Sequence, residues 1–195
     1  PNLLSNEIIS FISNSKNFVP HFHIPLQSGS DTILRLMRRR YDTKLYRSRI
    51  EKIKRLMPEA CIGVDVIVGF PGEDDDLFLE TMYFLESLNI SYLHVFSYSE
   101  RDNTHAISLS KIVKSNVRSK RSKLLRLLSS RKKSSFYKLN LGTIHDVLFE
   151  SEEKDGFIEG FSSNYIRFRR PWDPSLSGEI VKSIFTGIDE EGFAV

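Results

Sequence analysis

The chain of 195 residues contains a single cysteine, Cys61, which limits the chemistry that it can perform alone. One thiol can form neither an internal disulfide framework nor a metal cluster held by several cysteines. The sequence also lacks any run of 18 apolar residues, which excludes a membrane-spanning helix of ordinary length. We therefore expect a water-soluble protein with no membrane partner, in a reducing, cytoplasmic setting.

The first residue is Pro1 rather than Met, and no apolar leader with a small-residue cleavage site follows it. We therefore expect part of a longer protein rather than a secreted precursor. Charged residues make up 27% of the chain and hydrophobic residues 40%. This composition excludes wholesale disorder and fits one sizeable core with a small second domain.

The net charge of +3 conceals zones of different sign. Residues 1–110 hold 12 Lys and Arg against 14 Asp and Glu, residues 111–138 hold 11 against none, and residues 139–195 hold 5 against 11. A stretch of uncompensated positive charge repels itself unless an anion neutralises it, and phosphate backbones are the commonest large polyanions in a cytoplasm. Nucleic acid is therefore a candidate partner. The alternative is a solvated helix whose charges face water.

Short apolar runs alternate with amphipathic stretches in the first zone, which is typical of βα units around a parallel sheet. The pattern predicts strands at 21–26, 61–68 and 91–98, helices at 31–39, 44–57 and 76–88, and a basic helix over about 114–138. The sheet is either Rossmann-like or part of a barrel. In both folds ligands gather at the loops after the strands, here QSGS, GFPGE and SERDNT.

Short runs bounded by glycines predict further strands at 143–150, 157–161, 165–170 and 179–188. Ile166 and Phe168 alternate with Arg167 and Arg169, so one face of that strand is apolar and the other basic. Such regular short strands predict a small antiparallel barrel. We thus expect two domains, residues 1–138, including a basic helix from about residue 111, and residues 139–195.

Three polar residues lie near the predicted ligand loops. Gln27 offers an amide beside a glycine, although an ordinary helix cap explains the QSGS loop equally simply. Asp65 lies within an apolar strand, where a carboxylate needs a partner such as a ligand hydroxyl, a cation or an internal arginine. Arg39 follows Gln27 by one helix length and either clamps a carboxylate or is plain surface charge.

Other motifs point to no particular chemistry. The GFPGE loop at 69–73 permits close approach of a ligand to the backbone, but it matches neither the dinucleotide fingerprint nor the phosphate-binding P-loop. The histidines lack the spacing of common metal sites, so no metal ligand is predicted. No Ser-His-Asp arrangement or nucleophile elbow occurs, and no catalytic residue is assigned within the chain.

The sequence resembles the radical S-adenosylmethionine methylthiotransferases in three strings that occur in the family's order, HIPLQSGSDTILRLMRRRY, DVIVGFPGE and YLHVFSYSERDNTHA. The strand-rich tail with FSSNYIRF is similar to the family's C-terminal TRAM domain. This resemblance implies an α/β fold, the C-terminal part of a partial parallel (β/α) barrel of radical-SAM type, followed by a small TRAM-like β-barrel that binds RNA. The family's N-terminal domain and its CxxxCxxC loop have no counterpart here.

The resemblance also implies S-adenosylmethionine as a cofactor, and two 4Fe-4S clusters whose ligands lie outside this chain. In related enzymes a glutamine of the QSG-type loop and an aspartate of the next strand contact the ribose, and an arginine of the MxRxY-type segment contacts the carboxylate. The matching residues are Gln27, Asp65 and Arg39. Phe96, on the third strand, is a looser match for a residue that packs against the adenine.

The string SERDNT resembles the branch of the family that acts on threonylcarbamoyladenosine in tRNA, although Asp102 replaces the proline usual in that loop. The implied reaction inserts a methylthio group at C2 of adenosine 37, beside the anticodon, and consumes a sulfur donor. The chain alone is expected to be inactive. Its expected contacts with the anticodon stem-loop are Asn164, Tyr165, Arg167 and Arg169.

Three alternatives stay open. The same loops fit a methylthiotransferase that acts on isopentenyladenosine in tRNA, or one that acts on a ribosomal protein. A non-enzymatic RNA-binding module explains the basic helix and the small barrel, but it leaves Gln27, Arg39 and Asp65 without a role. The acidic balance of residues 139–195 argues against RNA binding by that part, because RNA-binding barrels are usually basic.

Overall fold

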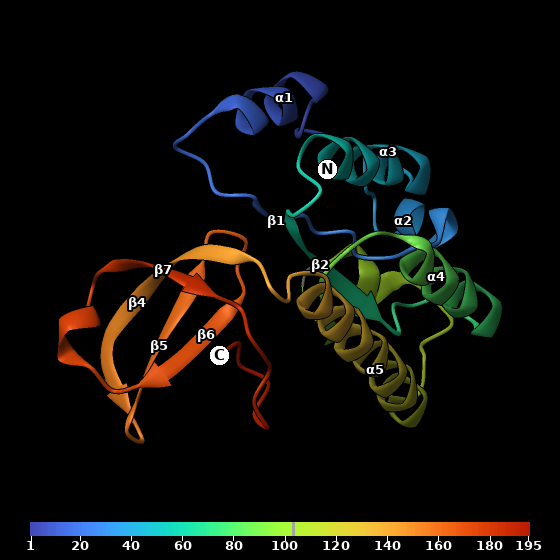
Figure 1. Cartoon of the computed structure of the whole chain (residues 1–195). Coiled ribbons are helices and arrows are strands. Elements are labelled where there is room, and N and C mark those ends of the chain that lie inside the picture. The colour runs from blue at the N-terminus through green and yellow to red at the C-terminus, as the bar shows by residue number, and fades with distance from the viewer. Residues whose placement is uncertain (103) are drawn as a thin grey trace.

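The protein is described by a computed structural model that covers residues 1–102 and 104–195. Its first part is a parallel sheet of strands β1 (His21–His23), β2 (Cys61–Val68) and β3 (Tyr92–Ser97), in the order β1-β2-β3 (Figure 1). All three strands run the same way, so the loops that follow them share one edge of the sheet. Asn103, in the SERDNT string, lies outside the described residues.

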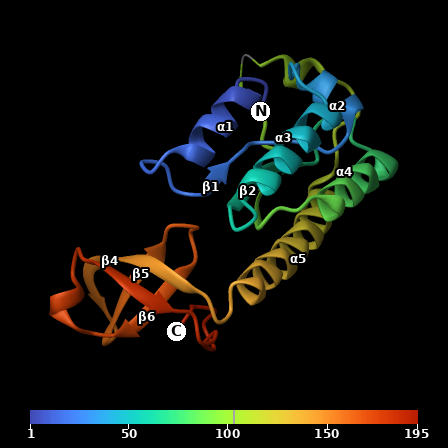
Figure 2. The same ribbon diagram turned by 45° about the horizontal axis from the view of Figure 1, so that its top comes forward.

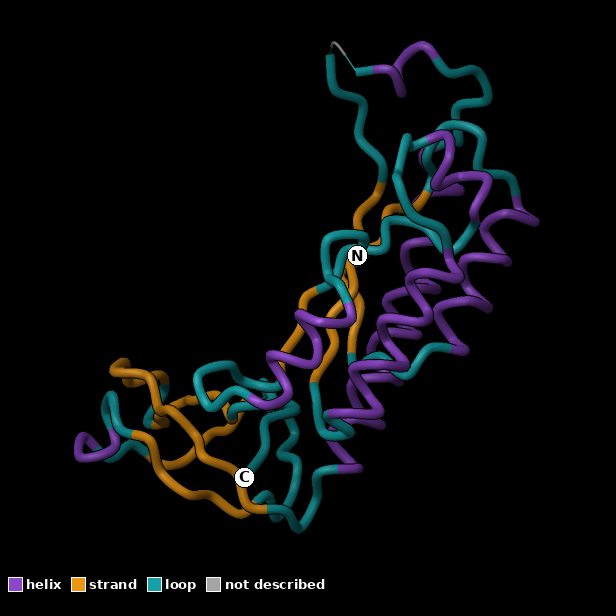
Figure 3. The backbone as a smooth tube through the Cα atoms, turned by 90° about the horizontal axis from the view of Figure 1, so that it is seen from above, coloured by secondary structure: helices purple, strands orange, loops and turns teal. Residues whose placement is uncertain are grey.

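The helices of this first part are α1 (Asn6–Asn14), α2 (Asp31–Leu36), α3 (Thr43–Leu56), α4 (Asp75–Ser87) and α5 (Ser115–Leu139), with a short 3-10 helix η1 (His105–Ser108). Helices α3, α4 and α5 lie on one side of the strands (Figure 3). Asp42 and Asp74 begin α3 and α4, because their carboxylates accept hydrogen bonds from the first-turn amides of Leu45 and Leu77. None of the helices in the described part is both long and apolar enough to cross a membrane.

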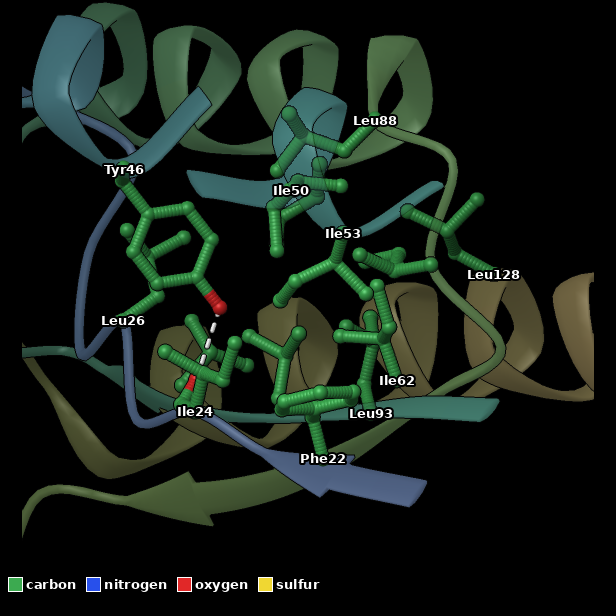
Figure 4. Close-up of a cluster of buried hydrophobic side chains, with 14 of the residues drawn as sticks. Phe22, Ile24, Leu26, Tyr46, Ile50, Ile53, Ile62, Leu88, Leu93 and Leu128 are labelled. Atoms are coloured by element: carbon green, nitrogen blue, oxygen red, sulfur yellow. Dashed lines mark hydrogen bonds between the residues drawn. The ribbon is translucent and has the colours of Figure 1, made fainter. Parts of the chain in front are cut away.

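The core of this part forms where α3 and α5 press on the sheet (Figure 4). Ile50 and Ile53 of α3 meet Ile62 of β2, and all three are at most 1% exposed. The hydroxyl of Tyr46, also fully buried, donates a hydrogen bond of 2.6 Å to the carbonyl of Ile24. That bond satisfies a carbonyl just beyond the end of β1 and fixes α3 against the strand.

Helix α2 ends three residues before the predicted residue 39. Arg38 has a φ of 54°, in the left-handed region that a continuing helix cannot contain. The amide of Arg39 then donates back to the carbonyl of Leu34 at 2.9 Å, which closes the helix in the manner of a Schellman cap. The chain therefore turns at Arg38 instead of carrying the arginine run away along a helix.

The loop after β2 is tied to α5 by a buried ion pair. Glu73, 3% exposed, accepts hydrogen bonds from the amide of Gly69 at 2.8 Å and from Nη1 of Arg121 at 2.7 Å. Nη2 of Arg121 donates to Asp75 at 2.7 Å. Burial raises the pKa of the Glu73 carboxyl, an effect that the amide and the guanidinium oppose.

This ion pair corrects the expectation of eleven uncompensated charges between residues 111 and 138. Arg121 is neutralised, Arg131 lies 4.0 Å from Glu86, and Nζ of Lys132 donates to the carbonyls at the end of α4. The basic residues of this segment that are exposed are Lys111, Lys114, Lys120, Lys123, Arg126, Arg131, Lys133 and Lys138. The positive surface of α5 is therefore smaller than the sequence indicates.

The second part is an antiparallel sheet of β4 (Ile144–Lys154), β5 (Phe157–Ser162), β6 (Arg167–Pro171) and β7 (Ile180–Ile184), with a 3-10 helix η2 (Pro174–Leu176). The strand order is β6-β5-β4-β7, and the sheet curls into a half-barrel (Figure 1), where the sequence predicted a small barrel. Asp155 and Gly156, both with positive φ, make the tight turn between β4 and β5. Ile166 and Phe168 face inward, as their alternation predicts, at no more than 1% exposure.

One apolar cluster joins the two parts. Phe149 of β4 and Phe185, just after β7, pack in a cluster with Cys61 at the start of β2 and with Phe136 and Tyr137 near the end of α5. Figure 2 shows the second sheet beyond the C-terminal end of α5. The half-barrel therefore lies against the amino ends of the parallel strands, away from their ligand edge.

Removing the guanidinium of Arg121 should strongly destabilise the fold. The Arg121→Ala substitution leaves Glu73 buried without its cation, which costs about 3 to 5 kcal/mol of the free energy of unfolding. Urea denaturation followed by circular dichroism measures this loss. Lys123→Ala removes an exposed charge from the same helix and should change stability by less than about 0.5 kcal/mol. Equal stability of the two variants would show that the ion pair does not hold the loop.

Candidate functional site

A cavity of about 690 Å³ opens at the carboxyl edge of the parallel strands. Its walls come from the loop after β1, the end of α2, and β2 and β3 with the segment that follows β3. Gln27, Arg39, Asp65 and Phe96 all line it, although they are far apart in sequence. The structure thus brings the four predicted cofactor residues together.

Gln27 extends the pairing of β1 and β2 beyond the proline that interrupts it. Its amide donates to the carbonyl of Asp65 at 2.8 Å, and its carbonyl accepts from the amide of Ile67 at 2.8 Å. Its φ of 73° is unfavourable for a residue with a side chain, and these two bonds hold it there. The side chain of Gln27 is thereby held at the cavity.

Asp65 lies on the open face of the sheet, so its partner is not a helix arginine. Its Oδ1 is 2.9 Å from Nε2 of His23, and the side chain keeps 21% of its surface exposed. His94 is the neighbour of Asp65 on β3, and the ligand atoms of His23, Asp65 and His94 all lie within 4.8 Å of one another. Sequence spacing missed this cluster because its members come from three different strands.

This cluster has the donor set of a borderline divalent cation, two imidazoles and one carboxylate. The contact within the cluster is the approach of Nε2 of His23 to Oδ1 of Asp65 at 2.9 Å. We therefore treat the cluster as the polar floor beside the cavity.

Positive side chains dominate the rim of the cavity. Arg38, Arg39 and Arg101 line it, and Asp65 is the one carboxylate among the described lining residues. The ion pairs found among residues 1–102 and 104–195 involve none of these three arginines. Such a rim fits an anionic ligand, which planar guanidinium groups bind through paired hydrogen bonds.

Phe96 presents its ring to the cavity and is 53% exposed. It pairs in register with Ile67, which lies on the same face of β2 as Asp65, so an apolar surface adjoins the polar groups of Gln27 and Asp65. Cavities that bind nucleosides need both, a flat apolar surface for the base and polar groups for the sugar. The arrangement therefore suits an adenosine with an attached carboxylate.

A smaller cavity of about 370 Å³ lies between the two parts of the chain. Tyr92, His94, Lys133, Tyr165 and Arg167 contribute to its walls. The ring of Tyr92 lies where a side chain at position 63 would be, because a Cβ on Gly63 would come within 2.4 Å of it. Burial raises the pKa of the Tyr92 hydroxyl well above its ordinary value.

Two of the predicted RNA contacts lie at this joint. Tyr165, with a φ of 65° and 44% exposure, stacks on His21 with ring centres 3.9 Å apart and also on Phe161. Asn164 is 1% exposed and donates to Oδ1 of Asn140 at 2.9 Å. The structure therefore places Asn164 inside the joint rather than on the surface, and its amide also donates to the carbonyl of Glu59 at 3.2 Å.

The other two predicted RNA contacts are already paired with acids. Arg167 forms an ion pair with Glu159. Arg169 is held by Asp189 at 2.7 Å and by Glu191 at 2.9 Å. The alternating sequence showed that both arginines leave the core, but it could not show the acids that cross-strand pairing and the C-terminal turn bring to them.

Residues 1–85 match the family model of the radical SAM superfamily. The chain is 36% identical over 183 residues to threonylcarbamoyladenosine tRNA methylthiotransferase MtaB of Bacillus subtilis, which covers 92% of this chain and 41% of that protein. It is 40% identical over 161 residues to tRNA-2-methylthio-N(6)-dimethylallyladenosine synthase of Wolinella succinogenes, which covers 80% of this chain and 36% of that protein.

A second MtaB, from Rickettsia prowazekii, is 32% identical over 190 residues and covers 96% of this chain and 43% of that protein. The chain thus spans less than half the length of these relatives. The similarities confirm the resemblance to radical SAM methylthiotransferases. They do not separate the two substrate branches, because relatives with both names match at comparable identity.

Proposed function

The chain belongs to the radical SAM family as a homologue of tRNA methylthiotransferases, and we propose that it is the part of such an enzyme that holds S-adenosylmethionine and binds tRNA. The proposed reaction adds a methylthio group to C2 of N6-threonylcarbamoyladenosine 37. The observation that carries the proposal is the convergence of Gln27, Arg39, Asp65 and Phe96 on one cavity.

Each of these residues has a role that its chemistry supports. Asp65 accepts hydrogen bonds from ribose hydroxyls and Gln27 adds an amide beside it, while Arg39 pairs with the methionine carboxylate. Phe96 packs against the adenine. When bound, S-adenosylmethionine supplies the methyl group and the radical that such enzymes use.

The residues of this chain do not fit an iron-sulfur cluster. Clusters take three or four thiolates, and Cys61 is the single cysteine. Cys61 is also buried in the cluster that joins the two parts, where burial raises its pKa to about 11. The proposal therefore assigns both clusters to residues outside this chain and expects the chain alone to be inactive.

The cofactor assignment predicts weaker binding of S-adenosylmethionine after changes at the cavity. Asp65→Asn removes a charged acceptor and Arg39→Lys removes a planar two-point donor, so each should weaken binding by about tenfold or more. Isothermal titration calorimetry of this chain measures the affinities. Arg40→Ala is the matched control, because Arg40 adjoins Arg39 but does not line the cavity. Unchanged affinity in both cavity variants would contradict the assignment.

The RNA-binding proposal is supported by the exposed charges of α5, which connects the two parts of the chain. Lys120, Lys123 and Arg126 are exposed on this helix. Tyr165 adds a half-exposed side chain at the joint, and because His21 and Phe161 already stack on its ring, RNA would contact its edge and hydroxyl. Arg167 and Arg169 can contribute only if RNA phosphates compete with their acidic partners.

RNA binding through α5 should depend steeply on salt. Each phosphate neutralised by a Lys or Arg contributes about 0.7 to 0.9 to the slope of log affinity against log salt. Replacing Lys120, Lys123 and Arg126 with alanine should therefore lower the slope for an anticodon stem-loop by about 2. Filter binding at salt concentrations between about 50 and 200 mM measures this slope.

The control for this experiment is a second triple alanine variant at exposed basic residues outside α5, Lys16, Lys44 and Arg55. It changes the net charge by the same amount and should leave the slope close to that of the unchanged chain. Equal slopes for the two triple variants would show that net charge alone, and not α5, attracts the RNA. A flat salt dependence of the unchanged chain would favour a protein substrate.

A further inference from the structure

Arg38 occupies a backbone conformation that suits glycine. It follows the last turn of α2 with a φ of 54°, and its amide donates to the carbonyl of Arg35 at 2.9 Å. Helices commonly end in this left-handed conformation, but the residue there is usually glycine, because a Cβ is disfavoured. The chain thus holds an arginine where the backbone alone favours a residue without a side chain.

The side chain of Arg38 lines the cavity at the carboxyl edge of the strands. The proposed function uses one guanidinium there, that of Arg39, for the carboxylate of S-adenosylmethionine. Arg38 and Arg101 stay without an assigned anion, and Asp65, the carboxylate among the described lining residues, already pairs with His23. The cavity therefore has positive charge left for a second anionic group.

The two substrates named for the relatives differ in this respect. A threonylcarbamoyl group on N6 of adenosine carries a carboxylate and a hydroxyl, whereas a dimethylallyl group is a hydrocarbon. A guanidinium that loses water to a hydrocarbon receives no hydrogen bond in return, so it rejects that substrate. A carboxylate at the same place would be bound by charge-assisted hydrogen bonds.

We propose that Arg38 is a specificity-determining residue, which binds the carboxylate of the threonylcarbamoyl group and disfavours the dimethylallyl group. The inference rests on the proposed function, because it places adenosine 37 in the same cavity as the cofactor. It extends that function by naming the residue that selects the substrate. The unfavourable backbone at Arg38 is consistent with a side chain kept for recognition rather than for folding.

The test compares three anticodon stem-loops that are identical except at nucleotide 37, which is N6-threonylcarbamoyladenosine, N6-dimethylallyladenosine or adenosine. Fluorescence anisotropy at one fixed salt concentration measures their binding to this chain. The unchanged chain should bind the threonylcarbamoyl stem-loop about tenfold more tightly than the other two. Arg38→Gly should abolish this preference, leave the affinity for the adenosine stem-loop nearly unchanged and strengthen binding of the dimethylallyl stem-loop. Glycine suits the left-handed backbone, so the variant should fold.

Arg40→Ala is the control, since it removes the same charge two residues away but outside the cavity. It should keep the preference, which separates recognition by Arg38 from a general loss of positive charge.

Equal binding of all three stem-loops by the unchanged chain, or a preference that survives Arg38→Gly, would overturn the inference and leave the proposed tRNA substrate in place. Absence of binding to every stem-loop would overturn both. Loss of the preference on addition of EDTA would assign recognition to a metal ion at His23, Asp65 and His94 and would also overturn the role of Arg38.

Discussion

The buried ion pair between Arg121 and Glu73 is the contact on which both candidate surfaces depend. It fixes the loop after β2, which adjoins the ligand edge of the sheet, to the helix that leads into the second sheet. A buried ion pair adds little net stability to the fold, because both charged groups lose their water. It does restrict the positions that the loop and the helix can take, because separating them would leave a buried charge unpaired. Cavity and basic helix are thus held in one geometry, as the proposed function requires.

The joint at the other end of the strands uses contacts of a different kind. The apolar cluster shared by the two parts buries hydrophobic surface between them. The stack of Tyr165 on His21 and the hydrogen bond from the Asn164 amide then fix how the two parts are oriented. Aromatic stacking and side-chain amide bonds both depend on orientation, so they set the angle of the half-barrel relative to the sheet. The half-barrel is therefore held near α5, the helix that carries the proposed RNA contacts.

Local pattern was enough to predict some elements and insufficient for others. The apolar run at 61–68 matches β2 residue for residue, because a buried parallel strand has a continuous signature. The end of α2 was missed, since nothing in an arginine run indicates that Arg38 turns left-handed. The four proposed cofactor residues follow from the family resemblance, whereas the pairing of Asp65 with His23 needed the sheet register. The burial of Asn164 was not predicted, because its hydrogen-bond partners are distant in sequence.

The central claim is that the cavity at the carboxyl edge serves methylthiolation of tRNA, and the nucleosides of tRNA report on it most directly. An Asp65→Ala codon change in the organism that encodes the chain alters the cavity without relying on any isolated fragment. Mass spectrometry of its tRNA should then show loss of 2-methylthio-N6-threonylcarbamoyladenosine and accumulation of N6-threonylcarbamoyladenosine. Unchanged amounts of both nucleosides, or loss of the dimethylallyl derivative instead, would contradict the account.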